Sequence, residues 1–141
     1  MLNEVNDLPM DKRIASVHCI PITENGSIVM AWDNEEQLLT TIGGRIDAAL
    51  KREAMEEEGI IIGTERVPFA SWYWKSSDTY TIWYLVKVEK FLPHPFDCEK
   101  SGYVIFNLET AKQLISKTEP DNDNRIQILN MAYDKVKLLN W

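Results

Sequence analysis

The chain has 141 residues, 45% of them hydrophobic and 10% aromatic, which is enough for one domain with an apolar core but not for a second. The formal net charge of −7 at pH 7 argues against a nucleic-acid polymer as partner, because binding one needs clustered lysine and arginine. The two cysteines, Cys19 and Cys98, fit neither a disulfide framework nor a zinc site. There is no run of about 18 apolar residues and no signal-like N-terminus, so we expect a cytoplasmic protein without a membrane partner.

The first predicted elements are strands. Residues 14–23 are rich in β-forming side chains and alternate between two faces. The pair Asn25-Gly26 favours a tight hairpin turn, and residues 28–32 are predicted to return as the partner strand. A short extended run is predicted over residues 38–42.

Two adjacent glycines, Gly43 and Gly44, end this extended run. Because glycine has no Cβ, the backbone there can approach a ligand or a metal ion closely, or it can adopt a positive φ in a turn. An isolated pair of glycines is compatible with both explanations. Their position directly before a predicted helix favours the close approach.

Beyond Gly59 the pattern changes from helical to extended. Two β-rich runs, residues 67–74 and 80–91, are separated by a polar turn and should pair as an antiparallel hairpin. Pro68 should lie at an edge or a bulge, because proline cannot donate to the ladder. Further strands are predicted at residues 60–62 and 103–107, and further helices at residues 108–115 and 126–139. This order of elements predicts an α+β domain that spans residues 1–141.

The densest group of charges lies in the helix that follows the glycine pair. On a helix, residues three and four apart share a face, so Glu53, Glu56 and Glu57 project toward one patch. Arg52 is placed to reach Glu56 one turn away. A hard divalent cation relieves the repulsion between such carboxylates and takes further ligands from water and phosphate. The alternative for a glutamate-rich run is a solvated helix face.

The run that begins at Arg52 and continues Glu-Ala-Met-Glu-Glu-Glu-Gly-Ile resembles the second half of the Nudix box, G-x5-E-x7-R-E-U-x-E-E-x-G-U, where U is aliphatic. Six specified positions occur within these nine residues, and Gly43-Gly44-Arg45 resembles the usual opening of the box. The chain therefore resembles the Nudix (MutT-like) hydrolases. The resemblance implies a Nudix-type α/β/α sandwich with a mixed, largely antiparallel sheet.

The first half of the box departs from the family pattern. The pattern places 13 residues between its first glycine and its arginine, whereas seven residues, 45–51, separate Gly44 from Arg52. Six residues are therefore absent, including an acid in the middle of the box. Two explanations stay open, a true deletion or a flexible loop tip missing from the sequence.

The resemblance also implies a reaction, the hydrolysis of a diphosphate linkage in a nucleotide or a nucleoside diphosphate derivative, with Mg²⁺ or Mn²⁺ as cofactor. Its metal ligands would be the carboxylates of Glu53, Glu56 and Glu57 and the backbone carbonyl of Gly43. Arg52 would hold the glutamates in position. These residues lie within or beside the box.

The general base is expected to be either a glutamate of the box, such as Glu53 or Glu56, or an acid from a distant loop. Glu99, just before the predicted strand 103–107, is the favoured loop acid, although an exposed carboxylate without a catalytic role explains it equally well. The catalytic residues suggested by the resemblance are therefore Arg52, Glu53, Glu56 and Glu99.

Aromatic side chains crowd the two strands of the predicted hairpin, where alternation must send them to opposite faces. One face is a candidate for stacking a nucleobase, and core packing is the commoner role. These side chains are Trp72, Tyr73, Trp74, Tyr80, Trp83 and Tyr84.

Two functions compete with hydrolysis. A Nudix-fold module that binds or senses a nucleotide without cleaving it would explain the shortened box, but not the retention of every acid. A structural domain that associates through the apolar stripe of the last helix, for example as a homodimer, would leave the carboxylates without a role.

Overall fold

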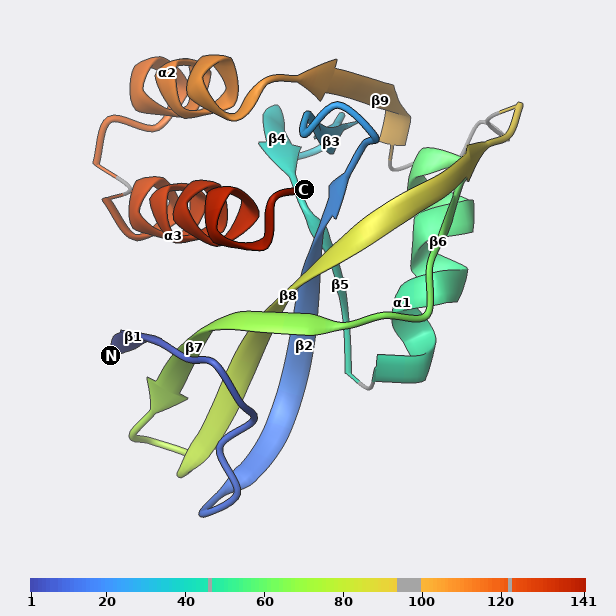
Figure 1. The fold of residues 1–141 in the computed structure, drawn as a ribbon. Coiled ribbons are helices and arrows are strands. Elements are labelled where there is room, and N and C mark those ends of the chain that lie inside the picture. The colour runs from blue at the N-terminus through green and yellow to red at the C-terminus, as the bar shows by residue number, and fades with distance from the viewer. Residues whose placement is uncertain (46, 94–99, 122) are drawn as a thin grey trace.

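The computed structural model describes residues 1–45, 47–93, 100–121 and 123–141 (Figure 1). The strands are β1 (Leu2–Glu4), β2 (Arg13–Ile22), β3 (Ile28–Asp33), β4 (Leu38–Thr40), β5 (Ile42–Gly44), β6 (Ile60–Ile62), β7 (Val67–Trp74), β8 (Thr79–Phe91) and β9 (Lys100–Phe106). The helices are α1 (Asp47–Glu53), α2 (Leu108–Thr118) and α3 (Asp123–Leu139), and a π-helical turn, η1 (Ala54–Glu58), continues α1.

The sheet is built around the parallel pairing of β2 with β8, in which Val17 lies opposite Ile82 and Ile20 opposite Leu85. The other strand pairs of the described chain are antiparallel, so the prediction of a mixed, largely antiparallel sheet is confirmed. Strands β7 and β8 form the expected hairpin, and its register shifts next to Pro68, where a bulge was predicted.

The predicted partner of β2 is wrong in part. The turn forms as expected, with the Thr23 amide donating to the Ser27 carbonyl at 2.8 Å and Gly26 at a φ of 82°. However, β3 pairs with β2 only at Ile22 and Ile28, and it then pairs with β4 and β9. The reason is that β2 already uses one edge for β8, while β5 occupies part of the other.

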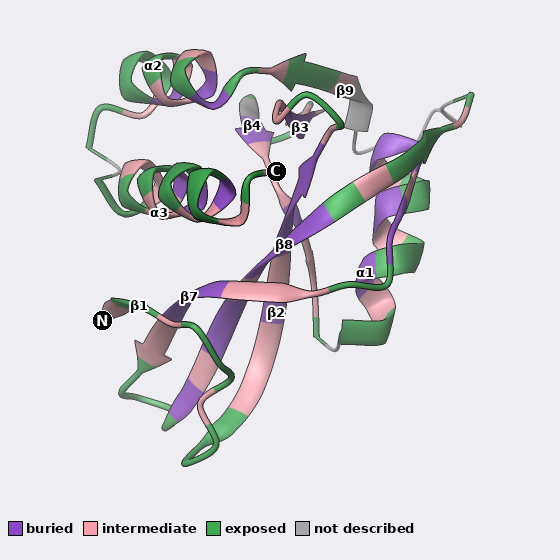
Figure 2. Ribbon diagram, viewed as in Figure 1, coloured by how far each residue is buried: buried purple, intermediate pink, exposed green. Residues whose placement is uncertain are grey.

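Helices cover both faces of the sheet, which gives the α/β/α layers (Figure 1). Because alternate residues of a strand point to opposite faces, Ile20 and Ile22 of β2 pack with α2 and α3, whereas Val17 and Cys19 pack with α1. Burial is concentrated in the strands and on the sides of the helices that face them (Figure 2).

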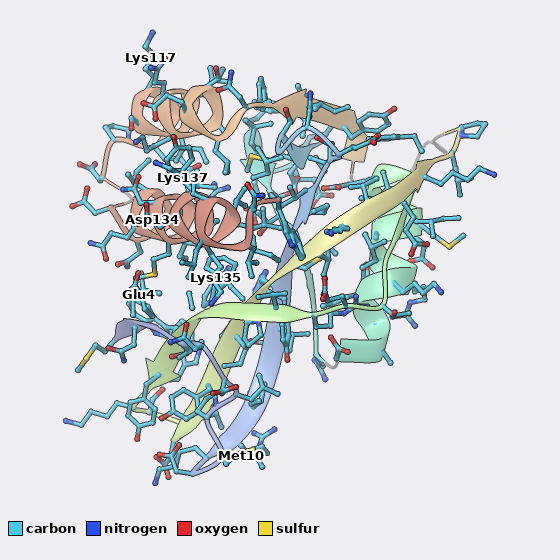
Figure 3. All side chains as sticks on the ribbon, in the orientation of Figure 1. Glu4, Met10, Lys117, Asp134, Lys135 and Lys137 are labelled. Atoms are coloured by element: carbon cyan, nitrogen blue, oxygen red, sulfur yellow. The ribbon has the colours of Figure 1, made fainter. Side chains whose placement is uncertain are left out.

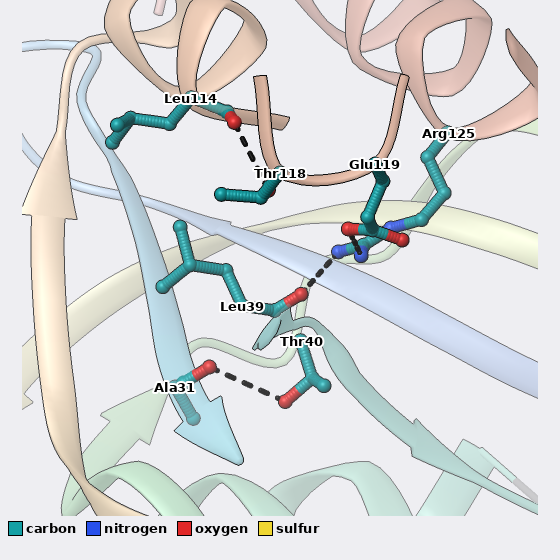
Figure 4. A network of polar contacts seen from close by, with 7 residues as sticks. All are labelled: Ala31, Leu39, Thr40, Leu114, Thr118, Glu119 and Arg125. Atoms are coloured by element: carbon teal, nitrogen blue, oxygen red, sulfur yellow. Dashed lines mark hydrogen bonds and ion pairs between the residues drawn. The ribbon is translucent and has the colours of Figure 1, made fainter. Parts of the chain in front are cut away.

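A polar network ties α3 to the sheet and to the end of α2 (Figure 4). The Arg125 guanidinium binds the Glu119 carboxylate and donates to the backbone carbonyl of Leu39 in β4. At the other end of α2, the side chain of Asn107 accepts a hydrogen bond of 2.7 Å from the Thr110 amide and caps the helix. These contacts fix the position of both helices over one face of the sheet.

We expect the packing of α1 on the sheet to depend on Leu50. Its side chain is 0% exposed, so Leu50→Ala should lower the free energy of unfolding by about 2–5 kcal/mol. Leu138→Ala is the matched control, because Leu138 is 76% exposed on α3 and should change stability by less than about 0.5 kcal/mol. Chemical denaturation measures both, and equal effects would contradict the packing described.

Candidate functional site

The acidic helix lies on the sheet through a stripe of three buried residues, Leu50, Ala54 and Glu58. Ala54 and Glu58 are both fully buried. This orientation leaves Glu53 at the edge of the contact, with its side chain 23% exposed, and turns Glu56 outward, with its side chain 58% exposed. The carboxylates of the box therefore differ in their access to solvent.

The second half of the box forms a π-helical turn that sequence reasoning missed. It ends at Gly59, which has a φ of 63°, and the Gly59 amide bonds to the carbonyls of Ala54 and Met55. A π-turn has more residues per turn than an α-helix, so Glu56 and Glu57 point in directions, relative to Glu53, that differ from those on a continuous α-helix. Such turns occur frequently at functional sites.

Arg52 contacts two of the three predicted ligands. Its Nη2 lies 3.3 Å from Oε1 of Glu53 and its Nε lies 4.0 Å from Oε1 of Glu56, so the expected reach of Arg52 to Glu56 is present. Within the described residues, no group of three or more His, Cys, Asp or Glu side chains is placed to hold a metal ion. The guanidinium therefore contacts two carboxylates whose donor chemistry fits a hard divalent cation.

Beside this helix is an open hollow of about 460 Å³. Its lining includes two arginines, Arg45 and Arg52, together with Glu53 and the backbone of Gly44. Guanidinium groups suit the geometry of phosphate oxygens, and a carboxylate among them suits a cation that accompanies the phosphate. The charged residues labelled in Figure 3 belong to α2, α3 and β1 and line no part of this hollow.

Gly43 has a structural reason to be glycine that the sequence did not reveal. It lies within β5, opposite His18 of β2, and it is not among the positive-φ glycines of the described chain. A Cβ at this position would lie 2.6 Å from Cε1 and 2.7 Å from Nδ1 of His18. The glycine is therefore required by the close approach of the His18 ring, in addition to any role of its carbonyl.

His18 is the residue near the site that sequence reasoning passed over. Its ring stacks on Trp83, with 5.3 Å between ring centroids and 14° between planes, and it leans on Gly43 from the other side. Burial lowers the pKa of His18, while a backbone contact with Ile42 acts in the opposite direction. Nδ1 is buried and makes no hydrogen bond to the described residues.

The first turn of α1 is held by an ion pair that was also not predicted. Nε of Arg66 lies 3.1 Å from Oδ1 of Asp47, and the same guanidinium binds the carbonyl of Gly63 in the loop after β6. Only residues 45 and 46 connect β5 to α1. Arg66 thus anchors the helix directly after this short connection.

The predicted loop acid, Glu99, lies outside the described residues. Its place relative to the box is therefore still a prediction.

Within the described chain, no helix is long and apolar enough to span a membrane.

Comparisons with known proteins identify the fold. The structure superimposes on a variant of a pyrophosphohydrolase from Bacillus subtilis with a TM-score of 0.68 and 18% identity, covering 99% of this chain and 92% of that one. The Ap4A hydrolase of C. elegans gives a TM-score of 0.59 and 11% identity over 89% of this chain and 98% of that one. A NUDIX hydrolase from Nitrosomonas europaea gives 0.53 and 16% over 88% and 90%.

No family model and no curated protein matches the sequence. With identities of 11–18%, the solved structures therefore carry a likeness of fold alone. Together with the layers and strand order described above, they show that this chain has a Nudix-like α+β fold.

The contact between Gly43 and His18 can be tested with a double-mutant cycle. Gly43→Ala should lower the free energy of unfolding by about 1–3 kcal/mol, because the new methyl group overlaps the His18 ring. In a His18→Ala background the same change should cost much less, because the ring is gone. Equal costs in the two backgrounds, measured by chemical denaturation, would show that the clash is absent.

The lowered pKa of His18 predicts a dependence of stability on pH. The unfolded chain protonates His18 near its ordinary pKa of about 6.5, whereas burial keeps the folded ring neutral to lower pH. The stabilisation is therefore complete above about pH 6.5 and is lost as the pH falls toward the folded pKa. Denaturation at several pH values should show a steeper acid loss for the wild type than for His18→Phe, and parallel curves would refute the assignment.

Proposed function

We propose that this chain is a divalent-metal-dependent Nudix-type hydrolase that cleaves a diphosphate linkage in a nucleoside diphosphate derivative or a nucleoside triphosphate. The observation that carries the proposal is the position of the acidic box beside a hollow lined by Arg45, Arg52 and Glu53, on a Nudix-like fold. The sequence supplies the acids, and the fold places them next to cationic side chains that suit phosphates. The structural neighbours, a pyrophosphohydrolase and an Ap4A hydrolase, support this reaction class.

The metal would be Mg²⁺ or Mn²⁺, held by carboxylates of Glu53, Glu56 and Glu57 and by the carbonyl of Gly43. When bound, it supplies charge neutralisation of the phosphates and a lower pKa for the attacking water. The protein's part is to present oxygen ligands that are partly or well exposed at the edge of the helix. Arg52, which already contacts Glu53 and Glu56, positions both carboxylates.

In the reaction, the oxygen of water bonds to one phosphorus atom, and the bridging P–O bond to the other phosphate breaks. A general base takes the proton of the water, and the leaving phosphate keeps the electrons of the broken bond. A glutamate of the box, Glu53 or Glu56, and the loop acid Glu99 are the two candidates for this base. Arg45 and Arg52 bind the phosphate oxygens from the hollow.

A second function, nucleotide binding without cleavage, is favoured by one feature. Arg52 contacts both Glu53 and Glu56, and the described residues present no group of three acidic or other metal-binding side chains ready for a cation. In this alternative the guanidinium, instead of a metal ion, neutralises the carboxylates of Glu53 and Glu56. Turnover in the presence of metal separates the two functions.

The direct test is a substrate screen. Purified protein with Mg²⁺ or Mn²⁺ is incubated with nucleoside di- and triphosphates, ADP-ribose and dinucleotides, and the release of phosphate, pyrophosphate or nucleotide is measured. We expect turnover of at least one compound, and its abolition by a chelator. Binding without turnover across the whole panel would favour the sensor module instead.

Variants of the box then link turnover to the site. Glu57→Gln keeps the size of the side chain but removes its charge, and we expect it to lower metal-dependent turnover by roughly 100-fold or more. Glu109→Gln is the matched control, because Glu109 is exposed on α2 and pairs only weakly, with Lys112 at 3.2 Å. If both variants keep full activity and metal binding, the carboxylates of the box are not the site.

A further inference from the structure

Two parts of the chain line the hollow beside the acidic helix. The first is the end of β5 with the residue after it, Gly44 and Arg45. The second consists of four residues of α1, namely Ala48, Ala49, Arg52 and Glu53. The shape of the hollow therefore depends on how α1 is placed relative to the end of β5.

Burial does not fix the first turn of α1. Asp47 and Ala48 are exposed and Ala49 is half-buried, and the first buried residue of the helix is Leu50. The connection to β5, residues 45 and 46, limits the distance between helix and strand but does not by itself set the angle between them. A helix of seven residues is marginal in isolation, so its direction depends on tertiary contacts.

The ion pair between Asp47 and Arg66 is a tertiary contact of this kind. Nε of Arg66 lies 3.1 Å from Oδ1 of Asp47. The side chain of Arg66 is 16% exposed, whereas that of Asp47 is 52% exposed. The connection between β6 and β7, to which Arg66 belongs, runs beside α1 (Figure 1). The contact thus joins an exposed turn of the helix to a guanidinium that is largely buried.

The guanidinium of Arg66 is itself held in place by the loop that carries it. Its Nη1 donates to the backbone carbonyl of Gly63, and the Gly63 amide donates to the carbonyl of Lys87 in β8 at 2.8 Å. A Cβ at Gly63 would lie 3.3 Å from Oε1 of Glu89, so this loop approaches β8 closely. Arg66 therefore connects the first turn of α1 to β8, a strand that pairs with β2, β6 and β7.

The charges of the ion pair also act on residues of the core beneath α1. Burial raises the pKa of Tyr84, Asp47 raises it further, and Arg66 acts in the opposite direction. Burial and then Glu58 raise the pKa of Cys19, and Arg66 again acts in the opposite direction. Arg66 therefore places a positive charge on the inner side of a helix that is crowded with carboxylates.

We propose that Arg66 is a positioning residue of the candidate site. By holding Asp47 against the loop after β6, it sets the angle of α1 to β5, and so the shape of the hollow that takes up the metal ion and the diphosphate. The described residues that line the hollow do not include Arg66, so it acts through the helix and not by touching a substrate. The inference rests on the proposed function and deepens it, because it names a residue outside the box on which that site depends.

The test is a double-mutant cycle that measures binding instead of turnover. The probes are Mn²⁺, followed by electron paramagnetic resonance, and methylenediphosphonate with Mn²⁺, followed by calorimetry. Asp47→Asn removes the charge but keeps the size, and Arg66→Met removes the guanidinium. Each should weaken both probes by about tenfold, as loss of a residue that orients metal ligands typically does. The double variant should bind no more weakly than either single variant, because both changes break the same contact.

A matched ion pair elsewhere in the chain is the control. Lys12 and Asp78 lie 3.2 Å apart, and the side chain of Asp78 is 56% exposed, close to the value for Asp47. Lys12→Met and Asp78→Asn should leave both affinities unchanged, because neither residue lines the hollow.

Arg66→Lys keeps the charge of Arg66 but not the fork that binds two acceptors, so its affinities should fall between those of Arg66→Met and the wild type. If Arg66→Met unfolds, Asp47→Asn and Arg66→Lys carry the comparison, and both should bind more weakly than the wild type. Folded variants that lose stability but bind both probes as tightly as the wild type would overturn the proposal. Losses of affinity that simply add in the double variant would also overturn it.

The outcome separates this inference from the proposed hydrolase. If the two positions are coupled in binding but no compound of the screen is hydrolysed, the positioning role of Arg66 stands and the enzyme proposal fails. If hydrolysis occurs and neither Asp47→Asn nor Arg66→Met changes the affinity for Mn²⁺ or the KM, the hydrolase stands and the positioning role fails. A wild type that binds neither probe would overturn the positioning role as well.

Discussion

The parallel ladder between β2 and β8 is the constraint on which the layers of the fold and the candidate site depend. Successive residues of a strand point to opposite faces, so the step from Val17 to His18 crosses from the layer of α1 to the layer of α2 and α3. The same ladder therefore supports the acidic helix on one side and packs against α2 and α3 on the other. A shift of this register by one residue would exchange the two faces and remove the surface on which the acidic helix packs.

The acidic helix shows how packing decides which carboxylates are available. Ala54 is fully buried and small enough to let the helix approach the sheet closely, and Glu58 is buried on the same side. The π-turn then redirects the residues that follow Glu53, since it changes the helical repeat. The availability of Glu56 to solvent follows from this orientation and not from its place in the motif.

Much of the fold was predictable because it depends on local patterns. The β7–β8 hairpin, the bulge beside Pro68 and the contact between Arg52 and Glu56 all follow from alternation, turn residues or helical spacing. The partners of β3 were not predictable, because the backbone groups along the edge of one strand can form hydrogen bonds with any of several other strands. The ion pair of Arg66 with Asp47 joins residues 19 positions apart, and no short-range pattern indicates it.

The sequence by itself determined the presence of the acidic box, the glycine pair and the alternating strands, because spacing along the chain is enough to recognise them. Only the tertiary structure decided what surrounds them. It brought Arg52 into contact with two glutamates, and it packed the ring of His18 against Gly43 and Trp83. The physical reason is that a long-range contact depends on how elements pack, and packing brings together residues whose separation in sequence carries no signal.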